Sequence, residues 1–159
     1  MKAEMTEIVM PSHTNHMGTC FGGTIMSWID TVAAIAAQRA VGSVVTASVD
    51  SIQFKKPIKL GDIVTLKASV NMIWGSSMEV GVKITCQSPV MRIHKFDLNY
   101  TELGGEQQVC KAYLTFVAIN NRGTRNVSDK LDTSSFNKED LRRCEDADLR
   151  RTMRLKAKK

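Results

Sequence analysis

The sequence lacks several features that would place it in a specialised class. No apolar run reaches the roughly 18 residues of a membrane helix, and the first residues, MKAEMTEIVMP, hold no apolar signal-peptide segment. The four cysteines, at positions 20, 86, 110 and 144, form no CxxC pair. This spacing argues against zinc ribbons and thioredoxin-type redox sites. We therefore expect a cytoplasmic protein with free thiols and no membrane partner.

Large aromatic side chains are also scarce, and the charge is uneven. Trp28 and Trp74 offer the only large stacking faces, and both fall in apolar patterns, which argues against a nucleic-acid partner. The net charge is +6, but residues 137–159 alone carry nine Lys or Arg against five Asp or Glu. Such a basic tail suits a phosphate-bearing ligand, nucleic acid or solvent.

What is present indicates one folded domain. A chain of 159 residues with 43% hydrophobic residues can build a core. We expect a single domain over residues 1–136 and a basic helix and tail over 137–159. In this tail, residues 137–155 lack Gly and Pro and predict a surface helix.

Strict alternation of apolar and polar residues predicts several strands with one buried face. Residues 62–74 and 78–86 alternate, and the short segment 75–77 between them suits a hairpin loop. Further strands are predicted at 109–119 and, less strictly, at 44–54. The positions expected to face inward are Val64, Leu66, Ala68, Val70, Met72 and Trp74, then Met78, Val80, Val82, Ile84 and Cys86, then Cys110, Ala112, Leu114, Phe116 and Ala118.

The remaining segments complete an α+β arrangement. Residues 4–10 predict one more strand, and 88–106 a long hairpin connection. Residues 24–40 predict a helix that is apolar nearly all round and therefore buried on every side. An antiparallel sheet in meander order, wrapped around this helix, leaves open edges that favour dimerisation by edge pairing.

Asp30 is the only formally charged side chain between Ile8 and Gln38. It lies two turns into the predicted helix, too deep to be an N-cap, and no cation is three or four residues away. An unpaired buried carboxylate is costly. Asp30 therefore either caps another element or bonds a backbone amide, or it acts as a general base or nucleophile.

Gly22 and Gly23 begin the predicted helix, where backbone N–H groups lack intrahelical partners. Glycine lets a ligand approach these N–H groups, which suit an oxyanion, although close packing explains two glycines equally well. Asp30 lies about 10 Å further along the helix axis. A substrate would not easily touch both groups of one chain, whereas a second protomer could bring its own loop across.

The segment HTNH suggests two further alternatives. His13, His16 and Cys20 could bind a metal, although this spacing is weak evidence. Cys20 could instead be a nucleophile with either histidine as its base. Asn15 could hold a water molecule or a carbonyl oxygen.

The segment MPSHTNHMGTCFGGTIMSWID resembles the signature of hotdog-fold acyl-CoA thioesterases, in the acyl-CoA hydrolase branch that forms trimers of dimers. The pattern there is P-x-x-x-N, a short loop, [FH]-G-G and an Asp eight residues on, which matches Asn15, Gly22, Gly23 and Asp30. VVTASVDSIQFKKPIKLGD, SSMEVGV, CKAYLTFVAI and LRRTMRL continue the resemblance, which covers about residues 5–155 apart from 88–106.

The resemblance implies a hotdog fold and the hydrolysis of acyl-CoA to a fatty acid and CoA, as in fatty acid metabolism. It implies that Asp30 is the general base or nucleophile, that Asn15 of another protomer positions water or the carbonyl, and that the Gly22 and Gly23 amides polarise that carbonyl. The catalytic unit would be a dimer within a homohexamer. No cofactor or metal is implied beyond CoA itself.

The resemblance also implies positions that bind CoA. The pantetheine arm would lie along two strand segments, and the phosphates would meet arginines of the terminal helix, with Arg151 as first choice. The positions are Ala47, Ser48 and Val49; Ser76, Ser77 and Met78; and Arg150, Arg151 and Arg154.

Three alternatives stay open. A non-catalytic hotdog sensor would bind acyl-CoA without turnover. A hotdog enoyl-CoA hydratase would need a histidine near the helix; none lies on it, but His13 and His16 are close upstream. A nucleic-acid binder would use the basic tail.

Overall fold

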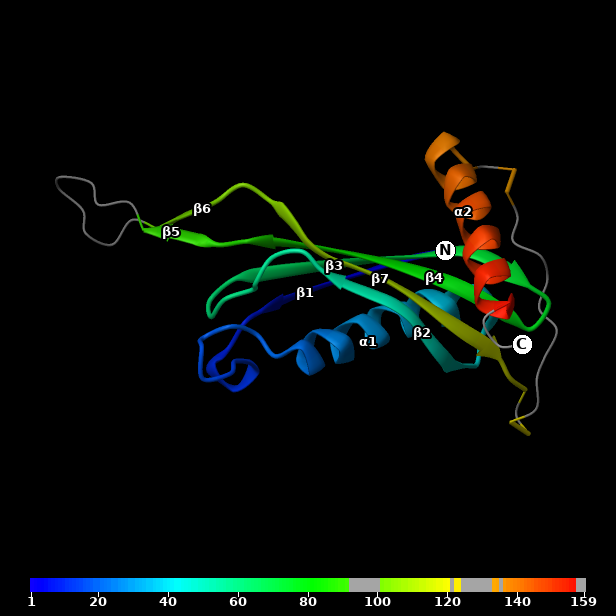
Figure 1. Cartoon of the computed structure of the whole chain (residues 1–159), viewed down its shortest axis with the longest axis horizontal. Coiled ribbons are helices and arrows are strands. Elements are labelled where there is room, and N and C mark those ends of the chain that lie inside the picture. Colours follow the sequence, from blue (N-terminus) through cyan, green and yellow to red (C-terminus); the bar gives the residue numbers. More distant parts are fainter. Residues whose placement is uncertain (92–100, 121, 124–132, 135, 157–159) are drawn as a thin grey trace.

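Five strands form one antiparallel sheet in the order β1-β3-β4-β7-β2, with a helix on each face (Figure 1). The computed structural model describes residues 1–91, 101–120, 122–123, 133–134 and 136–156. The sheet strands are β1 (Lys2–Ile8), β2 (Val44–Phe54), β3 (Ile63–Trp74), β4 (Ser77–Gln87) and β7 (Gln107–Ala118); the helices are α1 (Gly22–Val41) and α2 (Lys138–Lys156), and a 3-10 turn spans Pro11–His13.

The core lies between α1 and the sheet, and the strand pattern locates most of it. All the inward positions predicted on β4 and β7 are buried. They pack against one stripe of α1, which consists of Ile25, Ile29, Val32, Ala33, Ala36 and Ala37. Alternation therefore identifies the buried face of the sheet correctly.

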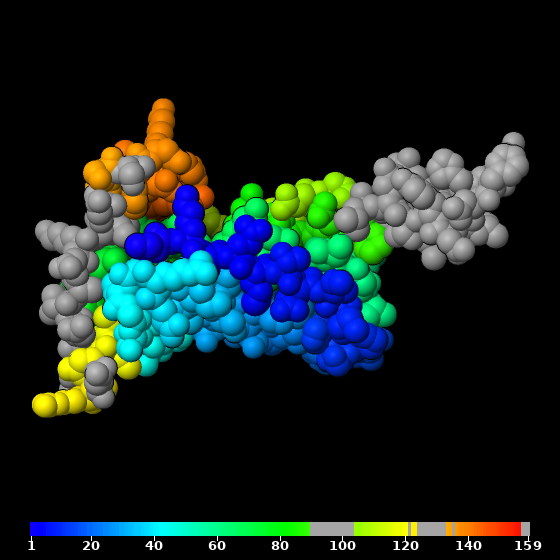
Figure 2. All heavy atoms as spheres, turned by 180° about the vertical axis from the view of Figure 1, so that it is seen from behind, coloured from blue at the N-terminus to red at the C-terminus, as the bar shows by residue number. Residues whose placement is uncertain are grey.

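The prediction that α1 is buried on every side is wrong for a single chain. Gly22, Gly23, Met26, Thr31 and Ile35 are exposed on the face turned away from the sheet. The reason is geometric, since one sheet covers only one side of a helix. From behind, the blue to cyan atoms of residues 1 to about 45 form the lower surface (Figure 2).

The meander order is correct only for β3, β4 and β7. Strand β2 does not lie beside β3; it pairs with β7 at the far edge, and β1 takes the place beside β3. Because β1 and β2 are opposite edges, α1 crosses beneath the sheet between them, and the segment between β2 and β3 crosses back.

The inward placement of Met72 and Trp74 is also wrong. The β3–β4 register shifts between Val70 and Met72, because Asn71 is an extra residue on β3. The bulge reverses the alternation. Ile73 is therefore buried, while Trp74 points to the other face and donates from Nε1 to Asp148 of α2 at 2.6 Å.

Helix α2 packs on the face of the sheet opposite α1. Its buried residues are Cys144 and Ala147, and Arg150 forms a bidentate ion pair with the fully buried Glu79 of β4. The predicted 88–106 connection is a hairpin where described: β5 (Pro89–Met91) pairs with β6 (Thr101–Leu103), and 92–100 lie outside the described residues. The domain boundary at 136/137 stays a prediction.

Candidate active site

Asp30 is half-buried and held by one hydroxyl group. Thr46 Oγ1 of the edge strand β2 donates to Asp30 Oδ1 at 2.8 Å. Within the described residues Asp30 has no ion pair, as the lack of a cation three or four residues away in the helix predicted. The carboxylate is thus fixed by a side chain of β2, and in the part of the chain that the structure describes it neither caps another element nor bonds a backbone amide. Oδ2 keeps its acceptor capacity.

The sequence reasoning missed Thr46. The register between β2 and β7 shifts at Ala47 and at Asp50, which have no partner on β7, so side chains of β2 do not alternate simply between the two faces. A strand pattern indicates which face a residue occupies, but not which helix residue it contacts. The sequence signal that could have pointed to Thr46 is a hydroxyl residue on an irregular strand, in a chain whose predicted helix carries a lone acid, Asp30.

The amides at the start of α1 are accessible. The first i→i−4 hydrogen bond runs from Ile25 to Phe21, so the N–H groups of Gly22, Gly23 and Thr24 precede it. An added Cβ on Gly23 would meet nothing within 4 Å, and on Gly22 it would only touch the Phe54 ring at 3.7 Å. Packing within the chain therefore requires neither glycine, so close packing inside a single chain does not explain why both positions are glycine. A hollow of about 370 Å³ opens beside Gly22.

Asn15 organises the loop that leads into α1. Its Oδ1 accepts from the backbone of Met17 at 2.9 Å and of Thr19 at 3.2 Å, and its Nδ2 donates to Thr19 Oγ1 at 2.9 Å. Gly18, with φ of 71°, makes the turn that brings Thr19 back. The loop fixes the amide of Asn15, and one Nδ2 hydrogen remains for a further acceptor.

The structure does not support Cys20 as a nucleophile. Cys20 is buried, and burial raises the pKa of its thiol, which disfavours the thiolate. His13 accepts from the Met10 amide at 3.2 Å and packs edge-on against Trp28. Among the described residues no hydrogen bond joins Cys20 to His13 or His16.

Strand β2 offers backbone at the predicted pantetheine positions. Ala47 has no partner on β7, and β2 is an edge of the sheet. Ser48 Oγ donates to Asp50, whose other oxygen accepts from Thr115 at 2.7 Å. At the second predicted segment, the Ser76 carbonyl accepts from Ala118, Ser77 Oγ donates to Trp74, and Met78 is buried in the core.

The three arginines of α2 differ in their partners. Arg150 is paired with Glu79, and Arg154 donates to Asp50 at 2.5 Å and also to Thr115. Arg151 lies over the Trp74 ring at 4.7 Å and forms no ion pair with any described residue. Arg151 therefore keeps its hydrogen-bonding groups for a ligand, as the first-choice prediction requires.

The described residues lack the features of two other classes of site. They contain no group of three His, Cys, Asp or Glu side chains placed to hold a metal ion. Neither α1 nor α2 is both long and apolar enough to cross a membrane.

Comparisons with known proteins agree with this geometry. Residues 17–92 match the family model of the Thioesterase superfamily. An uncharacterized acyl-CoA thioester hydrolase of Haemophilus influenzae is 36% identical over 117 residues, which cover 73% of this chain and 70% of that protein. The chain spans 18–25% of the length of the mouse and rat acyl- and acetyl-coenzyme A thioesterases that it also matches.

Solved structures show the same fold. An apo-hexameric acyl-CoA thioesterase superposes with a TM-score of 0.84 at 31% identity, covering 98% of this chain and 92% of the other. The acyl-CoA hydrolase of Staphylococcus aureus, solved with butyryl-CoA and CoA, gives 0.79 at 36% identity, covering 99% and 87%. That hydrolase has also been solved with one aspartate, asparagine or threonine replaced by alanine.

An antiparallel sheet wrapped around one central helix, as seen here and in these neighbours, is the hotdog fold. The chain belongs to the thioesterase superfamily, in the acyl-CoA thioesterase branch that the sequence motif indicates.

Proposed function

We propose that this protein hydrolyses acyl-CoA to a free fatty acid and CoA, without any cofactor beyond the CoA of the substrate. The observation that carries the proposal is Asp30, anchored by Thr46 on the half of α1 that the sheet leaves uncovered. A carboxylate with one oxygen fixed and one free is suited to orient and deprotonate water. Asp30 is thus the general base.

The supporting groups come from the loop before α1. The amides of Gly22 and Gly23 stabilise the negative charge that develops on the thioester oxygen, with the positive end of the helix dipole behind them. Asn15, fixed by its own loop, holds the water or the carbonyl with its remaining N–H. In the S. aureus hydrolase the replaced asparagine and aspartate are fifteen positions apart, as Asn15 and Asp30 are.

In this proposal each active site is built from residues of two protomers. Asp30 lies about 10 Å along α1 from Gly23, so Asp30 of one protomer works with Asn15 of the partner subunit. The edge strand β2 and the open face of α1 form the dimer surface, where Met26, Val45 and Val49 are each about 45% exposed. Such an apolar surface favours burial in an assembly.

CoA lies along the edge of β2 near Ala47, and Arg151 receives its phosphates. Arg150 and Arg154 hold α2 in place through Glu79 and Asp50. Three such dimers form a hexamer, the state of several structural neighbours.

The test is the release of CoA from an acyl-CoA panel of varied chain length, measured with a thiol reagent. Asp30→Asn should lower kcat by about 10²–10⁴-fold, the usual contribution of a general base, with an unchanged melting temperature. Glu145→Gln, which also removes one carboxylate, is the control because Glu145 is exposed on α2.

Wild-type turnover in Asp30→Asn would contradict the role of Asp30. Tight acyl-CoA binding without turnover by the wild-type chain would indicate the sensor instead. Hydration of an enoyl-CoA by the wild-type chain would indicate the hydratase.

A further inference from the structure

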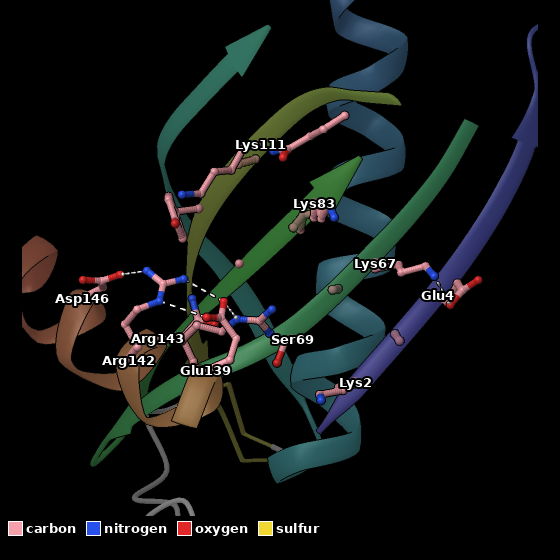
Figure 3. Close-up of a pocket in the computed structure, with 18 of the residues that line it drawn as sticks. Lys2, Glu4, Lys67, Ser69, Lys83, Lys111, Glu139, Arg142, Arg143 and Asp146 are labelled. Atoms are coloured by element: carbon pink, nitrogen blue, oxygen red, sulfur yellow. Dashed lines mark hydrogen bonds and ion pairs between the residues drawn. The ribbon is translucent and has the colours of Figure 1, made fainter. Parts of the chain in front are cut away.

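A second hollow, of about 770 Å³, lies on the sheet face opposite α1, between the strands and α2 (Figure 3). Its size falls in the range of small-molecule sites. Nine of its lining side chains are Lys or Arg and three are Asp or Glu. Arg39, near the C-terminal end of α1, also lines the hollow, but no residue of the segment 15–38 does, so Asp30 and the groups around it lie outside the hollow.

The floor of the hollow is a row of three lysines. Lys67 of β3 is directly opposite Lys83 of β4, which is directly opposite Lys111 of β7. In Figure 3 the three follow one another across the strands. Neighbouring residues in such a ladder are about 5 Å apart, so the row spans about 10 Å. Like charges placed directly opposite destabilise a sheet.

The charge of this row is only partly balanced by the protein. Lys67 has an ion pair with Glu4 at 3.6 Å, but both side chains are more than half exposed, which makes the pair weak. Lys111 lies over the Tyr113 ring at 4.8 Å. Lys83, in the middle, has no hydrogen-bond or ion-pair partner among the described residues.

The wall formed by α2 is closer to neutral than the row. Arg142 is paired with Glu139 at 2.7 Å and Asp146 at 2.8 Å, and Arg143 contacts Glu139 as well. Positive charge without an acidic partner among the described residues therefore remains at Lys83 and Lys111 on the floor, and at Arg39 and Lys55 elsewhere in the lining.

The shape beside the row favours a phosphate chain over a nucleobase. Gly81 lies two residues before Lys83 on the same face, and the Asn71 and Tyr113 side chains already fill the space above it, 2.8 Å and 3.3 Å from where a Cβ would stand. The Tyr113 ring is already covered by Arg150, whose guanidinium carbon is 3.8 Å from the ring centre. A base would find that ring face occupied.

We propose that the row Lys67–Lys83–Lys111 binds a small ligand with consecutive phosphate groups, at a site separate from the one that contains Asp30. Phosphate oxygens accept charge-assisted hydrogen bonds from lysines and relieve their mutual repulsion. Recognition is of the phosphate chain, so inorganic triphosphate and nucleoside triphosphates bind alike whatever the base.

The test is calorimetric titration of the full chain with inorganic triphosphate at low salt. Lys83→Gln should weaken binding about tenfold or more, the effect of one charge-assisted hydrogen bond. It should also raise the melting temperature of the ligand-free protein, since a like-charge neighbour is removed. Lys138→Gln, an exposed change of equal charge outside the hollow, should alter neither.

Separate titrations with ATP, GTP and CoA identify the source of the phosphates. Equal affinity for triphosphate, ATP and GTP, lost together in Lys83→Gln, supports the site. No binding of triphosphate, or equal binding by the wild type and Lys83→Gln, would overturn it. So would CoA displacing triphosphate while Lys83→Gln raises KM for acyl-CoA, because the row would then belong to the substrate site.

Discussion

At the residue scale, the hydrogen bond between Thr46 and Asp30 decides how the lone carboxylate can work. It is the one hydrogen bond that this carboxylate accepts within the described residues, and it joins the central helix to an edge strand. A hydroxyl is a neutral donor, so it fixes the orientation of Asp30 without forming an ion pair. The carboxylate can therefore keep its charge available for a water molecule.

We predict that Thr46→Val lowers kcat about tenfold or more, since a hydrogen bond to a charged group contributes about 1.5–3 kcal/mol. KM should change little, because Thr46 positions Asp30 and is not proposed to bind CoA. Thr46→Ser should restore most of kcat by keeping the hydroxyl. Steady-state kinetics of the three proteins checks this; equal loss in the Val and Ser variants would mean that packing, and not the hydrogen bond, matters.

Burial raises the pKa of individual cysteine thiols. All four cysteines are free and buried, and burial, with the neighbouring Asp62, raises the pKa of Cys86 to about 12. A raised pKa favours the protonated thiol in the folded state. The stability that it contributes is present below the usual value of 9 and is lost as the pH rises towards 12.

At the scale of elements, the bulge at Asn71 reverses the orientation of the end of β3. It turns Trp74 towards α2 and brings Asn71 beneath that helix, where Asn71 Nδ2 donates to Glu79 at 2.8 Å. The helices, the strands and most of the core could be predicted from periodicity. The bulge could not, because Met72, Ile73 and Trp74 are all apolar, so their pattern does not say which of them faces inward, and the register is set by pairing with β4.

The position of β2 in the sheet could not be predicted from the local sequence pattern either. Residues 44–54 predict a strand, but pairing with β7 rather than β3 depends on contacts far apart in the chain. Similarly, Asn15, Gly22, Gly23 and Asp30 could be selected from the sequence by charge, helix position and family resemblance. Thr46 could not, because its role lies in a contact between elements.

We predict that Arg150→Met lowers the free energy of unfolding by about 3 kcal/mol, since Glu79 would keep a buried charge without its partner. Adding Glu79→Leu should recover most of that loss. Urea denaturation measures both. Arg142→Met is the matched control, because the ion pairs of Arg142 are exposed and contribute little. Equal small losses in Arg150→Met and Arg142→Met would contradict the account of α2 docking.

At the scale of the whole molecule, the uncovered face of α1 and the open edge of β2 form the surface that we propose for dimerisation. Both expose large apolar side chains, namely Met26 and Ile35 on α1 and Val45, Val49 and Phe54 on β2. The lysine row lies on the opposite face of the sheet. Asp30 and the proposed triphosphate site are thus on different faces, whereas Arg151, proposed for the CoA phosphates, belongs to α2 on the face of the lysine row; titration with CoA separates these two phosphate sites.

We predict that Val45→Glu separates the dimer and abolishes turnover, because a charge would be introduced in the middle of an apolar contact. Light scattering after size-exclusion chromatography reports the mass. Leu141→Glu is the control, since Leu141 on α2 is 46% exposed, as Val45 is; it should keep the dimer and the activity. An active monomeric Val45→Glu protein would contradict a shared site.

The most direct test of the shared site is complementation between two inactive variants. Asp30→Asn and Asn15→Ala are prepared separately and also co-expressed with different tags, and acyl-CoA hydrolysis is measured for each preparation. If each site takes Asp30 from one protomer and Asn15 from its partner, every mixed dimer regains one intact site. With random pairing, co-expression then restores about a quarter of wild-type activity. If co-expression leaves the activity as low as in either variant alone, Asp30 and Asn15 serve the same chain and the two-protomer site is wrong.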